Sequence, residues 1–137
     1  MGGDEVSTGH QKPNFDEVYV NLANGLNALM HTQSYVSGIL GRETLDPTPE
    51  NIRTYALALS QEIHEFINEL GWKPWKAQKA RDRARVLDEF ADVLAFVGLF
   101  VVYLRAMGAL PTDLAEAYVD KSQVNIKRLE GFKATDV

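Results

Sequence analysis

The sequence predicts an all-α protein built as a bundle of four to five helices. Apolar residues recur at helical spacing in several long segments, glycines and prolines fall between those segments, and strand-like alternation is missing throughout. With 137 residues, of which 45% are hydrophobic, the chain is long enough for one domain with a core. We assign residues 15–133 to that domain and residues 1–14 to a flexible lead-in.

The first predicted helix runs from Phe15 to about Gln33 and opens after Pro13 and Asn14. Its apolar positions recur at helical spacing, namely Phe15, Val18, Leu22, Leu26 and Leu29. The next stretch, residues 34–49, contains two glycines and two prolines, which predict a loop with turns. A short helical piece is expected within it, around residues 35–40.

Three further helices follow. Thr48 as N-cap and Pro49 at the first helical position predict a helix from Pro49 to Leu70, which Gly71 ends. A third helix is expected from about Ala77 to Met107, before Gly108. The last one starts at Pro111-Thr-Asp113 and ends near Glu130-Gly131.

Two acidic couplets, Glu62-x-x-Glu65 and Glu89-x-x-Asp92, lie on the second and third predicted helices. Residues three apart on a helix lie on one face, so each couplet presents two carboxylates side by side. The short connection between the helices makes them antiparallel neighbours and can bring the four carboxylates level. Oxygen ligands of this kind suit a hard divalent cation such as Mg²⁺. The alternative is that the acids are ordinary solvent-facing charges.

The position of the acids around each helix favours the metal site. Glu62, Glu65 and Glu69 fall at the edge of the apolar stripe of their helix. On the third helix, the row of Arg85, Glu89 and Asp92 continues into apolar residues that must be covered, namely Phe96, Leu99 and Tyr103. Unpaired carboxylates there would cost several kcal/mol. A di-metal oxidase of the helical-bundle type fits poorly, because it needs Glu-x-x-His couplets and His64 has the wrong offset.

Composition excludes several classes of protein. The net charge of −5 and a pI near 5.1 argue against a nucleic-acid groove. The chain has no cysteine, hence no disulfide and no thiolate nucleophile, which fits a cytoplasmic protein. The longest apolar run, Val93–Leu104, is too short to span a membrane. Because this run is apolar all round, we expect a second subunit to cover part of it; burial within one chain is the alternative.

Other residues can carry chemistry or be ordinary surface. Lys73 and Lys76 follow the acidic helix, where they can bind phosphate or belong to a solvated turn. Trp72 and Trp75 can be core anchors or a stacking surface for a nucleobase. One face of the last helix carries a polar set that suits either a site or a charged surface, namely Lys121, Asn125 and Arg128.

These motifs together resemble the all-α nucleoside triphosphate pyrophosphohydrolase superfamily, the MazG-like and dimeric dUTPase group. The E-x-x-E and E-x-x-D couplets fit its signature. The turn Trp72-Lys-Pro-Trp-Lys76 and the helix K-x-x-x-N-x-x-R at residues 121–128 resemble the dimeric dUTPase branch most closely. In the first helix, Leu26-Asn27 resembles the L-N pair of that branch. The resemblance covers roughly residues 22–132.

The resemblance implies an activity and roles for residues. It implies Mg²⁺-dependent hydrolysis of dUTP to dUMP and pyrophosphate by a homodimer or homotetramer, with no nucleic-acid or membrane partner. Metal would be held by Glu62, Glu65, Glu89 and Asp92, with Glu62 also activating the attacking water. The phosphates would meet Lys73, Lys76, Lys121 and Arg128, and the base or sugar would meet Asn27, Trp75 and Asn125.

Two positions depart from the branch. Ala23 stands where a uracil-contacting Gln is usual. The alternative is therefore that the same reaction takes dCTP or a modified deoxynucleotide as its substrate. The distance from Arg128 to Gly131-Phe132 is one residue shorter than usual, so Lys127 competes with Arg128 for its place. An alternative from a different functional class is a helical oligomerisation module without catalytic activity.

Overall fold

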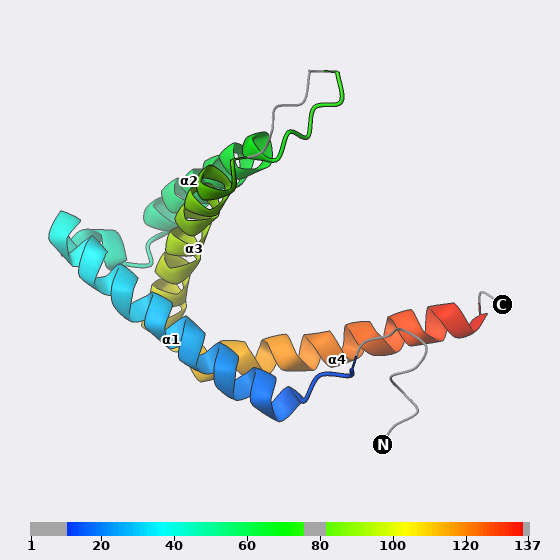
Figure 1. The fold of residues 1–137 in the computed structure, drawn as a ribbon. Coiled ribbons are helices and arrows are strands. Elements are labelled where there is room, and N and C mark those ends of the chain that lie inside the picture. Colours follow the sequence, from blue (N-terminus) through cyan, green and yellow to red (C-terminus); the bar gives the residue numbers. More distant parts are fainter. Residues whose placement is uncertain (1–10, 76–81, 136–137) are drawn as a thin grey trace. The chain divides into compact units, whose positions relative to one another are not determined.

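The computed structural model describes residues 11–75 and 82–135. Within these ranges the chain forms four α-helices and one short 3₁₀ helix, and no strand (Figure 1). The helices are α1 (Phe15–Leu40), α2 (Pro49–Glu69), α3 (Arg83–Ala106) and α4 (Pro111–Thr135), and the 3₁₀ helix η2 (Arg42–Leu45) connects α1 to α2. The predicted all-α fold class is confirmed.

The chain divides into two compact units. One holds Leu26–Leu110, and the other joins Met1–Gly25 to Pro111–Val137. The acidic couplets, α2 and α3 all belong to the first of these units, so the candidate site can be described within that unit. The assignment of one domain to residues 15–133 stays a prediction.

The first helix is longer than the sequence predicts. Asn14 caps it, since its Oδ1 accepts hydrogen bonds from the backbone N–H groups of Asp16 and Glu17 at 3.1 and 3.3 Å. The predicted end near Gln33 is wrong, because α1 continues to Leu40. A single glycine inside a helix costs only about 1 kcal/mol, so Gly38 does not stop it. The stop comes at Gly41, whose φ of 144° is left-handed backbone open to glycine.

The connection between α1 and α2 is fixed by side-chain hydrogen bonds. The Asn51 amide donates to the backbone oxygens of Glu43 and Asp46 at 2.8 and 3.0 Å. The Tyr103 hydroxyl donates to the backbone oxygen of Thr44 at 2.7 Å and thereby joins η2 to α3. A segment predicted to be a loop therefore has a defined course against the helix that carries two of the site acids.

The bounds of α2 agree with the sequence. The Thr48 hydroxyl accepts a hydrogen bond from the Asn51 N–H at 3.1 Å, and Pro49 occupies the first turn. Leu70 caps the other end, and Gly71 follows with a φ of 67°. The predicted helix from Pro49 to Leu70 is confirmed to within one residue.

The third helix begins later than predicted. The Asp82 carboxylate accepts hydrogen bonds from the N–H groups of Ala84 and Arg85, which makes it the N-cap of α3. Asp82 itself has extended backbone, so α3 starts at Arg83. The predicted first turns at 77–81 lie outside the described residues. At its other end α3 stops at Met107 and Gly108, as the sequence predicts.

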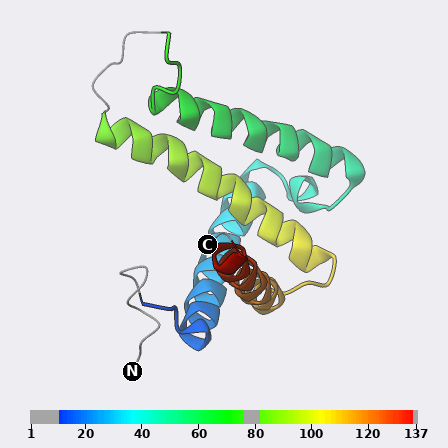
Figure 2. The same ribbon diagram turned by 90° about the vertical axis from the view of Figure 1, so that its right-hand side faces the viewer.

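The α2–α3 pair lies side by side and antiparallel, which both views show (Figures 1 and 2). Half of the apolar run in α3 is buried within the chain; its buried members are Val93, Gly98, Leu99, Val101, Val102 and Tyr103. Leu94 keeps 41% exposure. Burial within the chain therefore accounts for half of the run, and the predicted cover by a second subunit remains a prediction.

The last helix also runs beyond its predicted end near Gly131, to Thr135. Nothing lies within 4 Å of a Cβ placed at Gly131, and one glycine does not outweigh the surrounding helix formers. Among the described residues no single helix is long and apolar enough to cross a membrane, although the bent pair α3 and α4 passes that test together by length and composition.

Candidate metal centre

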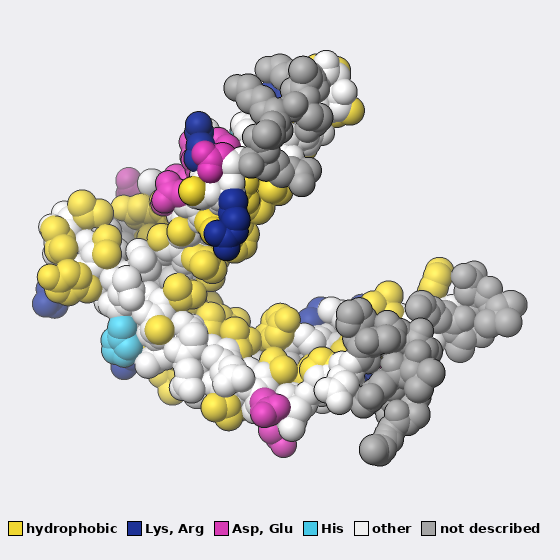
Figure 3. Space-filling model, viewed as in Figure 1, with side chains coloured by type: hydrophobic (Ala, Val, Ile, Leu, Met, Phe, Trp, Pro, Cys, Tyr) yellow, Lys and Arg dark blue, Asp and Glu magenta, His cyan; other side chains and the backbone are white. Residues whose placement is uncertain are grey.

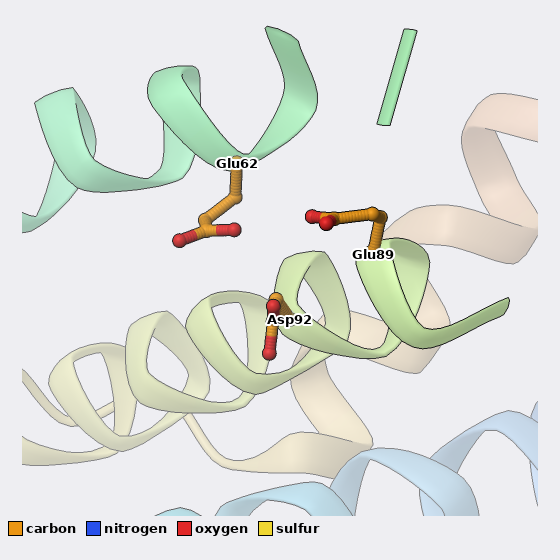
Figure 4. A group of neighbouring side chains, drawn as sticks. All are labelled: Glu62, Glu89 and Asp92. Atoms are coloured by element: carbon orange, nitrogen blue, oxygen red, sulfur yellow. The ribbon is translucent and has the colours of Figure 1, made fainter. Parts of the chain in front are cut away.

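Three of the four predicted carboxylates come together between α2 and α3. Glu62 projects from α2 toward α3, and Glu89 and Asp92 project from successive turns of α3 (Figure 4). One oxygen from each lies within 4.8 Å of the other two. The antiparallel pairing of the helices sets this arrangement, because it brings the middle of α2 level with the first half of α3.

Two oxygens of this cluster lack a partner. Glu62 Oε2 and Glu89 Oε2 are buried and receive no hydrogen bond among the described residues. Leaving a carboxylate oxygen buried without a hydrogen-bond partner is unfavourable, more so than for a neutral polar group. A hard divalent cation removes that cost, since it binds two or more carboxylate oxygens directly. An all-oxygen donor set with partnerless inner oxygens therefore fits Mg²⁺.

The acids of the cluster also repel one another. The pKa of Glu62 is raised by burial and, in decreasing order, by its neighbours Glu65, Asp92 and Glu89. The pKa of Glu89 is raised by burial first, then by Glu65 and Asp92. Each group resists ionisation because the others concentrate negative charge. A bound cation reverses this preference by favouring the charged carboxylates.

Glu65 borders the cluster. Its side chain is exposed, and it is not one of the three residues with mutually close oxygens. It nevertheless acts electrostatically on both Glu62 and Glu89. The predicted quartet is thus a trio with a fourth carboxylate beside it.

A salt bridge joins the same two helices. Arg85 Nη2 lies 3.0 Å from Glu69 Oε1. Acidic and basic side chains accordingly gather over the α2–α3 pair (Figure 3). Sequence reasoning placed both residues on the acidic rows but gave neither a role, although Glu69 lies four residues after Glu65 and Arg85 four before Glu89.

The tryptophan turn forms an aromatic cluster at the end of α2. The Trp72 indole N–H donates to Asn68 Oδ1 at 2.9 Å, and Lys73 Nζ lies 5.8 Å from the Trp72 ring. Trp75 meets Trp72 edge to face at 5.7 Å and keeps 70% exposure. Asn68 holds Trp72, and the arrangement leaves Trp75 accessible to an aromatic ligand. Lys76 lies outside the described residues.

The remaining predicted residues occupy two helices. Asn27 is exposed on α1, in the unit that holds the acids. Lys121, Asn125 and Arg128 are exposed on α4, in the other unit, and are described within that helix alone.

Arg128 and Lys127 lie on different faces of α4. At 100° per residue, Arg128 lies about 20° from Lys121 around the helix, and Lys127 lies about 120° away. Lys127 instead lines a hollow of about 390 Å³ beside Lys12 and Phe15. Arg128 therefore shares the face of Lys121.

Taken together, the fold and the cluster define an all-α protein with a carboxylate site suited to a hard divalent cation. The chain matches the family described as dUTPase over residues 25–109, more than half of its length, and this stretch contains all four acids. No curated protein and no solved structure matches the chain. The chain belongs to the all-α dUTPase family.

Proposed function

We propose that the protein is a Mg²⁺-dependent dUTP pyrophosphohydrolase that releases dUMP and pyrophosphate. The observation that carries the proposal is the trio of Glu62, Glu89 and Asp92 with its two partnerless oxygens, in a chain of the dUTPase family. A non-catalytic helical module accounts for the fold but gives no reason for these two oxygens to be buried without partners.

The metal ligands in this proposal are Glu62, Glu89 and Asp92, with Glu65 completing the shell. When bound, Mg²⁺ would neutralise charge on the phosphates and stabilise the charge that develops as the bond breaks. Because the carboxylates project from two packed helices, α2 and α3, they are preorganised, and binding of the metal and substrate would need little rearrangement of the backbone.

Glu62 is the proposed base. Its buried Oε2 has an unused acceptor position, so this carboxylate can accept a proton from a water molecule beside the metal site. In the proposed step a water oxygen attacks the α-phosphorus, and Glu62 takes the proton of that water. The bond from the α-phosphorus to the bridging oxygen breaks, and pyrophosphate leaves with that oxygen.

The proposed contacts to the substrate follow the family pattern. Lys73, Lys76, Lys121 and Arg128 would bind the phosphate chain. Asn27, Trp75 and Asn125 would meet the base and sugar. The high exposure of Trp75 and the fixed position of its neighbour Trp72 support the stacking role.

The second candidate is the same reaction on another deoxynucleotide, such as dCTP or a modified base. It rests on Ala23, whose methyl group cannot hydrogen-bond a base edge. The test is pyrophosphate release from a panel of canonical and modified dNTPs, with and without Mg²⁺. We expect dUTP to react fastest and EDTA to abolish turnover. Absence of Mg²⁺-dependent release from every nucleotide would contradict the proposed function.

A further inference from the structure

The Glu69–Arg85 salt bridge lies next to the carboxylate trio on both helices. Glu69 follows Glu65 by one helical turn on α2, and Arg85 precedes Glu89 by one turn on α3. Glu69 is close enough to contribute to the raised pKa of Glu89. The pair therefore borders the trio on the side of the α2–α3 turn.

Arg85 has capacity for a second ligand. One guanidinium nitrogen, Nη2, contacts Glu69, and the Arg85 side chain keeps 68% exposure. A guanidinium has five N–H donors in a planar fork that matches phosphate oxygens. A contact to one carboxylate therefore leaves further N–H donors for a phosphate. An exposed salt bridge is worth only about 0–1 kcal/mol, so an incoming anion can compete with Glu69.

The acids around the trio repel a phosphate anion, so phosphate binding needs a cationic side chain nearby. Glu65, Glu69 and Asp88 all add negative potential at Glu89. Glu62, Glu65 and Glu69 form one row along α2, and Glu89 and Asp92 form the facing row along α3. Among the described residues of α2 and α3 in these two rows, Arg85 is the one cation. Arg85 is thus the cation of α3 nearest in sequence to Glu89 on the same helical row, where an anionic phosphate chain would otherwise meet these acids.

We propose that Arg85, which contacts Glu69 in the structure, exchanges this contact for the phosphate chain of the substrate. The inference rests on the proposed function, since it takes the nucleoside triphosphate as the ligand. It adds a phosphate contact from α3, the helix that supplies Glu89 and Asp92, so the same element would hold the metal ligands and orient the chain.

The competing role for Arg85 is purely structural, as one half of a link between α2 and α3. The two roles differ in what the loss of arginine does. A structural link would hold the trio in place, and its loss would weaken metal binding and phosphate binding alike. A phosphate contact would leave Mg²⁺ affinity unchanged or slightly tighter, because removing a nearby cation favours another cation.

Three variants separate these roles. Arg85→Gln removes the guanidinium. Arg83→Gln removes the same charge from an exposed position of the same helix, about 200° away around its axis. Glu69→Gln breaks the same salt bridge but keeps the arginine. Calorimetry would measure the affinity of each protein for Mg²⁺ alone, then for tripolyphosphate and for α,β-imido-dUTP in saturating Mg²⁺, with circular dichroism to verify the helices.

We expect Arg85→Gln to weaken binding of both phosphate ligands by about ten- to a hundredfold, as the loss of a charge-assisted hydrogen bond does. Mg²⁺ affinity should stay within about threefold, Arg83→Gln should resemble the parent, and Glu69→Gln should retain the phosphate affinity of the parent or exceed it.

Three results would overturn the inference: parent-like phosphate binding by Arg85→Gln, an equal loss in Arg85→Gln and Glu69→Gln, or an equal loss of Mg²⁺ and phosphate affinity. A parent protein that binds Mg²⁺ but neither phosphate ligand would also refute it and leave the metal site standing. A parent that does not bind Mg²⁺ would refute the proposed function itself.

Discussion

Glu62 is unusual for a carboxylate near the surface, because one of its oxygens is buried and has no hydrogen bond among the described residues. Its pKa is raised by burial and by three neighbouring acids, so the protein without metal keeps this carboxyl in an unfavourable place. A carboxyl in such surroundings lowers the stability of the protein without a bound cation.

The first prediction concerns Glu62→Gln. We expect kcat to fall by about 10²- to 10⁴-fold, as loss of a general base does. The melting temperature without metal should stay the same or rise, because one repelling charge is gone. The rise of melting temperature with added Mg²⁺, which reports binding to the folded state, should shrink.

Glu50→Gln is the matched control, because Glu50 is an exposed acid in the first turn of the same helix. It should keep both the activity and the Mg²⁺-induced shift of the parent. Activity within a few-fold of the parent in Glu62→Gln, at saturating Mg²⁺, would show that another group activates the water.

Substrate choice is a second property set by single residues. Ala23 lies one helical turn before Asn27 on α1 and offers only a methyl group. A site that hydrogen-bonds a base rejects analogues by a factor of about 10⁴ or more, far better than a site that relies on fit alone. We therefore expect hydrolysis of at least one further pyrimidine dNTP beside dUTP, and a narrower range in Ala23→Gln.

The measurement for this second prediction is kcat/KM for dUTP, dCTP and dTTP in both proteins. A parent selectivity of about 10⁴ or more for dUTP would show that a residue other than position 23 reads the base. An unchanged range in Ala23→Gln would place position 23 away from the base.

At the scale of the helices, one glycine sets how closely α1 approaches α3. A Cβ at Gly98 would lie 2.7 Å from Gln33 Cγ and 3.0 Å from the backbone oxygen of Leu29. The side chain of Gln33 can move, but the Leu29 carbonyl belongs to the backbone of α1 and cannot move without shifting that helix. The contact is therefore available to glycine alone in the present arrangement.

The third prediction follows from this contact. We expect Gly98→Ala to lower the free energy of unfolding by about 1–3 kcal/mol, since overpacking outweighs the gain in helix propensity. Gly25→Ala, on α1 with nothing within 4 Å of the new Cβ, should instead stabilise the protein by about 0.5–1 kcal/mol. Urea titrations compare the two. Stabilisation by both substitutions would mean that the helices are further apart.

A hydrogen bond links α3 to the connection before α2. Tyr103 is 1% exposed, and its hydroxyl donates to the Thr44 backbone oxygen. Burial first, then the neighbouring Tyr55, raises the pKa of Tyr103 above its ordinary value. Ionisation would remove the donor and leave a buried anion, so the link depends on the protonated phenol.

The fourth prediction is an alkaline limit on stability. The unfolded chain loses the Tyr103 proton near pH 10, whereas the folded protein keeps it to higher pH. The stability that the protonated phenol supplies is therefore complete below about pH 10 and is lost as the pH rises through the folded-state pKa.

Tyr103→Phe tests this dependence. The variant should be about 1 kcal/mol less stable than the parent at pH 8, and the difference should shrink above pH 10. The free energy of unfolding of both proteins as a function of pH gives the answer. A difference that is constant from pH 8 to pH 11 would exclude ionisation of Tyr103 as its cause.

Helix type and most helix ends could be predicted from the sequence because they depend on local features. Thr48 and Pro49 start α2, and Gly108 ends α3, each through the chemistry of one or two residues. The two helix ends that were predicted too early both followed from giving a glycine too much weight. Gly38 and Gly131 both lie inside helices, because tertiary and neighbouring contacts outweigh about 1 kcal/mol.

The acids of the candidate site could be predicted because helical spacing fixes which side chains share a face. Spacing could not show that Glu65 would lie beside the trio and not within it, since that depends on the rotation of α2 against α3. The roles of Arg85 and Asn68 were missed for a similar reason. Each depends on a partner, Glu69 and Trp72, whose rotamer the sequence does not specify.

At the scale of the whole chain, apolar surface is left uncovered. On α2, Leu57, Ile63 and Ile67 keep 67%, 41% and 36% exposure. Together with Ser60, Gln61 and His64 they line an open hollow of about 520 Å³ that contains none of the acids. Further large apolar side chains are exposed at the end of α1, namely Tyr35, Val36, Ile39 and Leu40. Large exposed apolar side chains gathered on one surface are typical of protein interaction sites.

The last prediction is that the protein is an oligomer in which this face of α2 is covered by a second copy. Because Leu57 and Ile67 are exposed in the single chain, Leu57→Glu with Ile67→Glu should cost an isolated chain little. The same charges in an interface without partners cost several kcal/mol, enough to dissociate a dimer. Light scattering should give a dimer or tetramer for the parent and a smaller species for the double variant, with the helical signal retained. A parent that is monomeric at micromolar concentration contradicts the prediction, and a double variant that keeps the mass of the parent would place the interface on another face.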